Sequence, residues 1–384
     1  MILDRNNSDA SGFRLAIIAL ESLFEGIGLQ SQFGLLFRDR LLMWHDKNQD
    51  NNTCVLRFPT GDPYIFSYKD ACANISNMVP TLQDLAKVYE LFSDSASREL
   101  FLDLLCFKIL GSLRVSLLSN KETFQKFYKQ AEKCVVRSRV IPAGFSLDGS
   151  DSSYLDFCSF VYGRDRILMY ASPVCILNDF LLNQYEYQEK NVRIKAERGD
   201  SVIDAGACWG DSSLYFSSCV GNEGEVFAFE FMPGNRAILE KNMMMNAVLG
   251  RRVRVVSNGL WSHSGEELSF FQNGPGSRIV INGNFPVNGL CEKTISVDDF
   301  VASSNIKKID FIKMDIEGAE LNALHGAAKT LSKFNPKLAI CIYHNAQADY
   351  IAVPLYLQSL GNYNHFYIKH SSMHLEETVL FATA

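Results

Sequence analysis

The chain has 384 residues, of which 47% are hydrophobic and 21% are charged, and its formal net charge is −6. These values are typical of a globular protein of roughly two to three domains. The negative balance argues against a general nucleic-acid binder, which would carry a basic surface. Arg251, Arg252 and Arg254 form the densest basic cluster, and we interpret it as a solvated turn before a strand.

Ten cysteines are spread over the chain, none of them in a Cys-x-x-Cys pair, and several stand in apolar runs. We therefore expect reduced, buried thiols in a cytoplasmic protein rather than disulfides or a cysteine-bound zinc. The most apolar long segment, residues 100–118, is interrupted by Asp103, Lys108 and Arg114. Because a membrane-spanning helix needs about 20 apolar residues, the sequence predicts no transmembrane segment.

Residues 1–180 are predicted to form an accessory domain of helices and short strands. No motif in this region points to chemistry, so the domain could select the substrate, mediate homo-oligomerisation or simply pack against the rest of the chain. Apolar periodicity and turn residues predict helices at 93–111 and 121–134 and strands at 135–141 and 166–170.

Residues 181–384 are predicted to form a second domain, in which strands and helices alternate. Near-continuous apolar strands that alternate with helices predict a mostly parallel sheet covered on both faces, an α/β fold. A Gly- and Asn-rich insertion, 262–296, is expected to form a hairpin or flap, with a tight turn at Asn282-Gly283. The expected strands are 201–204, 225–230, 253–257, 310–315, 337–342 and 377–382, and the expected helices are 212–218, 233–247, 318–332 and 353–360.

The most informative motif is a glycine turn, SVIDAGACWGDSS. A short apolar strand ends at Asp204, Gly206 and Gly210 follow, and a helix is expected to begin at Asp211. Such a turn builds the ligand crevice of open α/β sheets, because glycines let the backbone approach a ligand closely. An acid replaces the first glycine of the dinucleotide fingerprint, and Asp211 would repel a phosphate. The motif therefore favours a cationic nucleoside without phosphates, such as S-adenosylmethionine.

Further candidates for the same crevice stand where the other predicted strands end. Glu230 ends the second strand and can accept hydrogen bonds from both ribose hydroxyls, with Phe231 beside it. Asn258 and Gly259 follow the third strand, where the adenine edge is expected. The predicted cofactor-binding residues are Asp204, Gly206, Ala207, Gly210, Asp211, Glu230, Phe231, Asn258, Gly259 and Asp315.

Acidic and imidazole side chains follow the fourth and fifth predicted strands. Asp315 and Glu317 stand two residues apart, so both can face the crevice, and Glu320 follows them. Acids also favour the first turn of a helix, and a histidine such as His344, directly after an apolar strand, is often structural. The crevice position nevertheless makes His344, Asp315 and Glu317 the predicted catalytic residues.

From about residue 200 to its end, the chain resembles the FkbM family of S-adenosylmethionine-dependent methyltransferases. The resemblance is carried by VIDAGACWGDSS, VFAFEFMPGN, ISVDDF, DFIKMDIEGAE, PKLAICIYH and the closing ETVLFA. It implies a class I methyltransferase fold, Rossmann-like and mostly parallel with seven strands, preceded here by the mixed α/β accessory domain. It also implies an O-methyltransferase of glycans or other secondary metabolites, with Asp204, Gly206, Gly210 and Glu230 holding the cofactor.

Methyl transfer to a hydroxyl requires removal of its proton, and His344 is our first choice of general base because its ordinary pKa lies near operating pH. In an alternative version, Asp315, Glu317, Glu320, His344 and His370 supply ligands for a divalent metal beside the acceptor. Two other classes remain open: a nicotinamide-dependent oxidoreductase, against which the missing first glycine argues, and a non-catalytic nucleoside-binding protein.

Overall fold

The computed structural model describes residues 32–45, 63–118, 120–143, 154–271, 273–279, 291–345 and 347–384. The chain divides into two compact units. One comprises Met1–Asn120 with His365–Thr378, and the other comprises Lys121–Asn364 with Val379–Ala384. The division falls at Asn120 rather than near residue 180, so residues 121–180 pack with the unit that carries the glycine turn. A separate functional domain over residues 1–180 stays a prediction.

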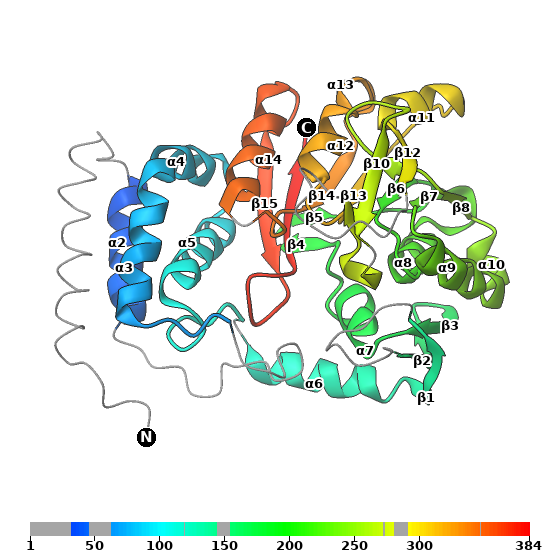
Figure 1. Cartoon of the computed structure of the whole chain (residues 1–384), viewed down its shortest axis with the longest axis horizontal. Coiled ribbons are helices and arrows are strands. Elements are labelled where there is room, and N and C mark those ends of the chain that lie inside the picture. Colours follow the sequence, from blue (N-terminus) through cyan, green and yellow to red (C-terminus); the bar gives the residue numbers. More distant parts are fainter. Residues whose placement is uncertain are drawn as a thin grey trace. The chain divides into compact units, whose positions relative to one another are not determined.

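The first unit is built from helices and from the strand β15. Its main elements are α2 (Gln32–His45), α3 (Tyr68–Met78), α4 (Leu82–Leu91), α5 (Ser95–Leu110) and β15 (His365–His370) (Figure 1). The structure confirms the helix predicted from residue 93 to residue 111. Asp94 caps α5 by accepting a hydrogen bond of 2.8 Å from the backbone N–H of Ser97. The helix ends at Gly111, whose φ of +76° favours glycine.

A three-stranded antiparallel sheet opens the second unit. Its elements are α6 (Lys121–Glu132), β1 (Val135–Pro142), β2 (Tyr154–Tyr162) and β3 (Asp165–Ala171), with the strand order β1-β2-β3. The sequence predicted α6, β1 and β3 but missed β2. Buried and half-buried residues are mixed along β2 without strict alternation, so the period-2 signal of a strand is weak there. The short elements that follow are α7 (Pro173–Cys175), a π-helical turn (Ile176–Leu181), β4 (Tyr187–Glu189) and β5 (Val192–Ile194).

Two asparagines attach β3 to helix α9 (Pro233–Met245). The amide of Asn242 pairs with the backbone N–H and C=O of Tyr170 at 2.8 and 3.0 Å. Asn246 pairs in the same way with Leu168 at 3.0 and 2.6 Å. Four helical residues rise about 6 Å and two strand residues about 6.6 Å, so the spacings match. The side-chain amides therefore satisfy an edge of β3 that would otherwise be unpaired.

We expect Asn242→Ala to destabilise the protein by about 2–3 kcal/mol, because it leaves the part-buried backbone groups of Tyr170 without partners. The measurement is urea unfolding followed by circular dichroism. Met244→Ala on the same helix is the control, since Met244 is 73% exposed, and its effect should stay within about 0.5 kcal/mol. Equal stabilities of the two variants would contradict the structural role of Asn242.

A large mixed sheet forms the centre of the second unit, as the α/β prediction requires. Within this unit its strands are ordered β16-β14-β13-β6-β7-β8. Neighbouring strands from β14 to β8 are parallel, and β16 runs antiparallel to β14. The strands not yet given are β6 (Ser201–Ala205), β7 (Glu225–Phe229), β8 (Val253–Val256), β13 (Phe311–Met314), β14 (Lys337–Cys341) and β16 (Thr378–Thr383).

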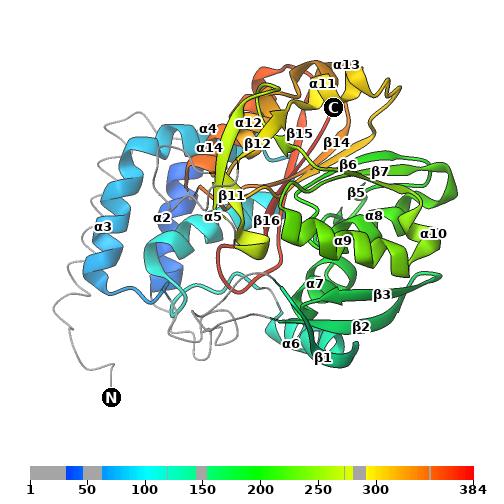
Figure 2. The ribbon, with the colours of Figure 1, turned by 45° about the vertical axis from the view of Figure 1, so that its right-hand side comes forward.

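Helices cover both faces of this sheet (Figures 1 and 2). One face carries α8 (Asp211–Val220), α9 and α10 (Ala247–Gly250), and the other carries α11 (Val297–Ser303), α12 (Glu320–His325), α13 (Ala328–Phe334) and α14 (Gln347–Ser359). The prediction of a single helix over 318–332 is wrong, because the helix is interrupted between α12 and α13. A Cβ on Gly326 would lie 2.2 Å from the carbonyl oxygen of Trp261, so the backbones approach closely at the break.

The insertion after β8 forms a second, four-stranded sheet in the order β11-β10-β12-β9. Its strands are β9 (Gly259–Leu260), β10 (Glu267–Phe271), β11 (Arg278–Ile279) and β12 (Cys291–Ile295). The antiparallel pairs of β10 with β11 and β12 agree with the predicted hairpin or flap. The turn predicted at Asn282-Gly283 lies outside the described residues. We call β10, β11 and the short helix between them (Gly274–Gly276) the flap.

In the described part of the chain, no helix combines the length and the hydrophobicity that crossing a membrane would require.

Candidate functional site

A cavity opens where β6, β7 and β13 end. Its walls come from the turns after these strands, from helix α9 and from the flap. This is the edge at which open α/β sheets bind ligands, because the carboxyl ends of parallel strands meet there. Among the predicted site residues, the lining includes Gly206, Glu230, Phe231, Asn258, Asp315 and Glu317. The structure thus brings residues from four predicted strand ends to one cavity.

Glu230 is the buried acid of this cavity. Its carboxylate accepts a 2.8 Å hydrogen bond from the backbone N–H of Met232. Burial raises the pKa of Glu230 to about 7, although the hydrogen bonds from Met232 and Asn235 act to lower it. Asn235 also donates to the carbonyl oxygen of Gly274 at 3.0 Å and so ties the flap to the start of α9. The cavity therefore contains one desolvated carboxylate that can accept hydrogen bonds.

The glycines of the turn are needed for packing. Gly206 has a φ of +83°, and a Cβ there would lie 1.8 Å from the carbonyl oxygen of Asp315. Gly210 has a φ of +86°, and a Cβ there would lie 2.8 Å from Met243 Cε. Both positions therefore exclude side chains on backbone and steric grounds. Sequence reasoning found these glycines, but it assigned them only to the ligand.

Asp204 lies beneath the cavity, fully buried, and does not line it. Its carboxylate accepts hydrogen bonds from Ser212 at 2.9 Å and from Ser213 at 2.6 Å, and it forms an ion pair of 3.1 Å with Lys313. Lys313 also donates to the carbonyl oxygens of Ala205 and Gly206. This buried network joins β6, α8 and β13. Sequence reasoning missed Lys313, because a lysine inside an apolar strand shows no partner in the sequence.

Four other predicted cofactor residues do not line the cavity. Ala207 is fully buried, and Gly259 packs against Phe231. Gly210 is the N-cap of α8, which begins at Asp211. Burial raises the pKa of Asp211, while a hydrogen bond with Cys175 acts to lower it. Contact of these four residues and of Asp204 with a cofactor stays a prediction.

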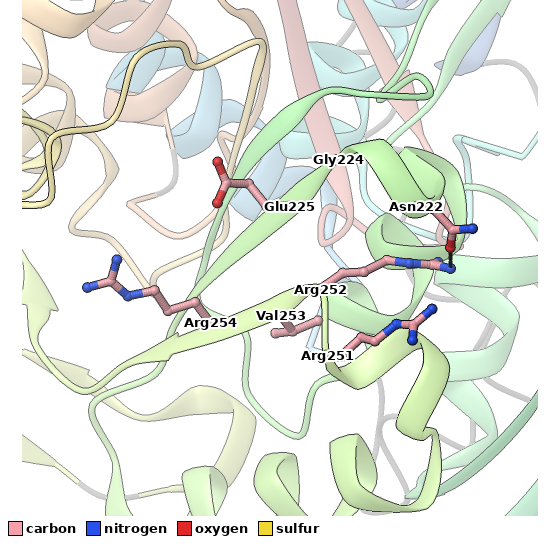
Figure 3. A pocket seen from close by; sticks show the side chains of 7 residues that line it. All are labelled: Asn222, Gly224, Glu225, Arg251, Arg252, Val253 and Arg254. Carbon is pink, nitrogen blue, oxygen red and sulfur yellow. Dashed lines mark hydrogen bonds between the residues drawn. The ribbon is translucent and has the colours of Figure 1, made fainter.

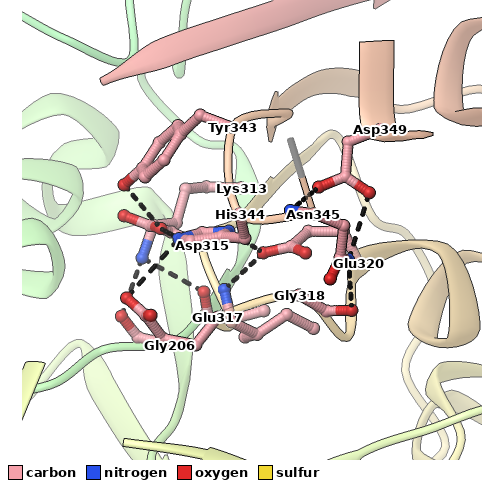
Figure 4. Close-up of polar contacts among 12 residues, drawn as sticks. Gly206, Lys313, Asp315, Glu317, Gly318, Glu320, Tyr343, His344, Asn345 and Asp349 are labelled. Carbon is pink, nitrogen blue, oxygen red and sulfur yellow. Dashed lines mark hydrogen bonds and ion pairs between the residues drawn. The ribbon is translucent and has the colours of Figure 1, made fainter. Parts of the chain in front are cut away.

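Asp315, Glu317 and His344 converge beside the cavity (Figure 4). His344 Nε2 lies 3.3 Å from Asp315 Oδ1 and 3.4 Å from Glu317 Oε1. Asp315 also accepts hydrogen bonds from the hydroxyls of Tyr185 at 3.0 Å and Tyr343 at 3.2 Å. The predicted catalytic residues therefore form one cluster, and two tyrosines that the sequence did not single out orient Asp315.

Local backbone geometry aims these side chains. Glu317 has a φ of +55° and Gly318 a φ of +97°, which makes a tight turn between β13 and α12. A non-glycine residue in the left-handed region is uncommon and marks a constrained position. Asn345 donates to the carbonyl oxygen of Gly318 at 2.9 Å and is itself held by Asp349 at 3.2 Å. The turn is thus fixed from the neighbouring strand end.

Glu320 supports the cluster from the first turn of α12. It is fully buried, its Oε1 accepts from the backbone N–H of Ile316 at 2.8 Å, and the same oxygen lies 2.8 Å from His344 Nδ1. Burial acts to lower the pKa of His344, but Glu320, Asp315 and Glu317 together hold this pKa well above its usual range. Burial acts to raise the pKa of Asp315, yet His344, Lys313 and Tyr185 hold it well below its usual range. His344 is therefore favoured as an imidazolium among carboxylates.

His370 belongs to the other compact unit, where its Nδ1 lies 2.9 Å from Thr378 Oγ1.

A second cavity is lined by the basic cluster Arg251, Arg252 and Arg254 together with Asn222 and Glu225 (Figure 3). It lies where β7 and β8 begin, at the edge opposite to the strand ends that carry the cluster of Asp315. The guanidinium of Arg252 donates hydrogen bonds to the carbonyl oxygen of Ser217, at 2.8 Å, and to Asn222 Oδ1. Arg251 and Arg252 lie in the turn before β8, as the sequence predicts, whereas Arg254 lies within that strand.

Comparisons with known proteins find a methyltransferase family and methyltransferase relatives. Residues 204–363 match the family model of the methyltransferase FkbM domain. Methyltransferase 1 of Beauveria bassiana is 26% identical over 183 residues, which are 42% of this chain and 72% of that protein. The hexuronic acid methyltransferase AglP of Haloferax volcanii is 32% identical over 147 residues, which are 37% of this chain and 55% of that protein.

A crystal structure of the methyltransferase FkbM from Methylobacillus flagellatus is similar with a TM-score of 0.48 at 18% identity. The match covers 80% of this chain and 60% of that one, so the chain spans little more than half the length of AglP and of this protein. The family model and the two curated relatives support a methyltransferase, and residues 204–363 match the methyltransferase FkbM domain, as the sequence motifs implied.

Proposed function

We propose that the chain uses S-adenosylmethionine to methylate a hydroxyl group of a sugar. The observation that carries the proposal is the cavity at the strand ends, which places Glu230 and Gly206 next to Asp315 and Glu317 within the FkbM domain. One side of this cavity suits a nucleoside, and the other presents an acidic cluster. Both halves of a transfer reaction therefore have candidate residues within one cavity.

The residues that line the cavity suit this cofactor. Glu230 is almost fully buried, and its carboxylate faces the cavity, where it can accept hydrogen bonds from both hydroxyls of a ribose. Phe231 and Asn258 offer an apolar face and an amide for a base. The strand order also supports the proposal, because β8-β7-β6-β13-β14 corresponds to the Rossmann order 3-2-1-4-5. We assign the sheet to the class I methyltransferases on that basis.

When bound, the cofactor supplies a methyl group that its sulfonium makes electrophilic. We propose that Asp315, Glu317 and His344 hold the acceptor oxygen in line with that methyl group and draw off the hydroxyl proton. The O–CH₃ bond forms as the S–CH₃ bond breaks, and the electron pair of the broken bond stays on sulfur. The role of His344 as a general base stays a prediction. Three surrounding carboxylates favour its protonated form, and a protonated imidazole carries a positive charge but cannot accept a proton.

A sugar acceptor fits the carboxylates of the cluster, which can accept hydrogen bonds from hydroxyls. AglP, a relative of the FkbM segment, is named for methylation of a hexuronic acid, which also supports a carbohydrate acceptor. We further propose that residues 1–180 contribute to acceptor choice or to self-association.

The test is calorimetric titration of the full chain with S-adenosylhomocysteine and, separately, with NADH. We expect S-adenosylhomocysteine to bind at one site per chain and NADH to give no heat, because Asp211 begins the helix at which a pyrophosphate would lie. Methyl transfer from labelled S-adenosylmethionine to a panel of monosaccharides and uronic acids then tests catalysis. Binding of NADH alone would favour an oxidoreductase, and cofactor binding without turnover on any acceptor would favour a nucleoside-binding protein.

A further inference from the structure

We propose that Asp315, Glu317 and His344 bind a divalent metal ion with a preference for oxygen ligands, such as Mn²⁺ or Mg²⁺. Each residue offers one ligand atom, and these atoms all lie within 4.8 Å of one another. Two carboxylate oxygens and one imidazole nitrogen form a ligand set that suits such an ion, with water or substrate oxygens completing the octahedron.

The separations fit coordination of one ion by all three side chains. His344 Nε2 lies 3.3 Å from Asp315 Oδ1 and 3.4 Å from Glu317 Oε1. Ligands about 2.1–2.4 Å from an ion and at right angles to each other lie about 3.0–3.4 Å apart. Both separations of His344 lie within this range, and the third pair of ligand atoms lies within 4.8 Å. Asp315 and Glu317 line the cavity, so the remaining coordination positions would face it.

The imidazole supplies an independent observation. The side chain of His344 is only 7% exposed, and its Nε2 lies near Asp315 and Glu317 without meeting the geometry of a hydrogen bond to either. Such a buried nitrogen is normally satisfied, and this one points at two carboxylate oxygens (Figure 4). A metal ion between the three groups would satisfy it through the lone pair of the neutral ring.

The surroundings of the three residues are those of a metal centre. Glu320 Oε1 lies 2.8 Å from His344 Nδ1, which is the carboxylate–histidine arrangement that fixes the tautomer of a ligating ring. Tyr185 and Tyr343 donate hydrogen bonds to the two oxygens of Asp315 and so hold that carboxylate in place. A divalent ion would also balance the charges of Asp315 and Glu317.

The role of the ion in catalysis rests on the proposed function. In that reaction, the ion would orient two neighbouring oxygens of the sugar. It would also lower the pKa of the hydroxyl that receives the methyl group. The proton of that hydroxyl leaves to water or to a carboxylate of the cluster. With the ion present, His344 acts as a ligand and no longer as the general base that the sequence suggested.

The test is binding of Mn²⁺ to the full chain, freed of metal by chelator and desalted, measured by the loss of the electron paramagnetic resonance signal of free Mn²⁺. We expect one ion per chain and competition by Mg²⁺. Glu317→Gln and Asp315→Asn should each weaken binding at least about tenfold, and Glu320→Gln about tenfold to a hundredfold. The control is Glu223→Gln, an exposed acid away from the cluster, which should bind like the wild type.

Circular dichroism and S-adenosylhomocysteine binding of each variant verify that it is folded. If the wild type binds Mn²⁺ only weakly and Glu317→Gln binds it with the same affinity, the proposed metal site is wrong. If S-adenosylhomocysteine fails to bind while Mn²⁺ binds at one site, the proposed function fails and the metal site stands. If the cofactor binds and methyl transfer proceeds unchanged after chelation, the metal is not part of the reaction.

Discussion

Replacement of Lys313 by methionine is expected to destabilise the protein by about 3–5 kcal/mol, because it leaves the buried carboxylate of Asp204 without its counter-charge. Lys313 is 1% exposed and lies 3.1 Å from Asp204 Oδ1. It also donates to two backbone carbonyl oxygens at the end of β6, and these would lose a donor. Methionine has a similar length, so packing changes little. Urea unfolding followed by tryptophan fluorescence measures the loss.

The double variant Lys313→Met with Asp204→Asn is the matched control. It removes both charges, and the hydroxyls of Ser212 and Ser213 can still donate to the asparagine carbonyl oxygen. We expect it to be more stable than Lys313→Met alone, since the unpaired charge is gone. If the losses in the free energy of unfolding of Lys313→Met and of Asp204→Asn simply add in the double variant, the ion pair is not what stabilises this junction.

The second prediction concerns Glu230 and the pH dependence of cofactor binding. Burial raises the pKa of Glu230 to about 7, so its ionised fraction rises about tenfold between pH 6 and pH 8. Since the ionised carboxylate is the form that accepts from both ribose hydroxyls, we expect S-adenosylhomocysteine to bind about tenfold more tightly at pH 8. Glu230→Gln should bind about 10- to 100-fold more weakly at pH 8 and lose the pH dependence.

The free energy of unfolding of the cofactor-free protein should change in the opposite direction. The pKa of Glu230 is raised from 4.5 to about 7 in the folded state, so the folded protein holds this proton more tightly than the unfolded chain. This contribution is fully present below pH 4.5 and is lost as the pH rises through about 7. Relative to the wild type, Glu230→Gln should therefore gain up to about 3 kcal/mol between pH 4 and pH 8.

Calorimetry at pH 6 and pH 8, together with urea unfolding at pH 4 and pH 8, measures both effects. Glu223→Gln removes an exposed carboxylate and serves as the control for general charge effects. A wild type that binds S-adenosylhomocysteine equally at both pH values would show that Glu230 does not contact the ribose. Parallel changes in binding and in stability would show that the variant acts through folding alone.

The glycine turn illustrates how far the sequence leads at this site. Asp204, Gly206 and Gly210 identified the strand, the turn and the helix start, and each of these elements is present. The physical reasons differ from those inferred from the sequence. Gly206 makes room for the backbone of Asp315, and Asp204 faces Lys313 rather than the cavity. The partners are Lys313 in β13 and Asp315 directly after that strand, about 110 residues later in the chain, and no local pattern reveals them.

The acidic cluster shows the same division. Residue types and strand ends placed Asp315, Glu317 and His344 at one edge of a sheet, and the structure brings them within contact distance. The left-handed backbone of Glu317 and the contacts from Tyr185 decide where the carboxylates point. Tyr185 lies before the first strand of the large sheet, so its role depends on how that segment packs over β13.

Alternation of apolar strands and helices, read with the glycine and acid motifs, predicted the α/β class and most strands of the large sheet, and the resemblance of those motifs pointed to the FkbM family. Periodicity of this kind is local, because it reflects which face of each element must be buried. The tertiary structure alone decided the strand order, the break between α12 and α13, the attachment of β3 to α9 and the pairing of Lys313 with Asp204. These features depend on contacts between residues distant in the chain, where burial and hydrogen-bond geometry, rather than local propensity, select the partner.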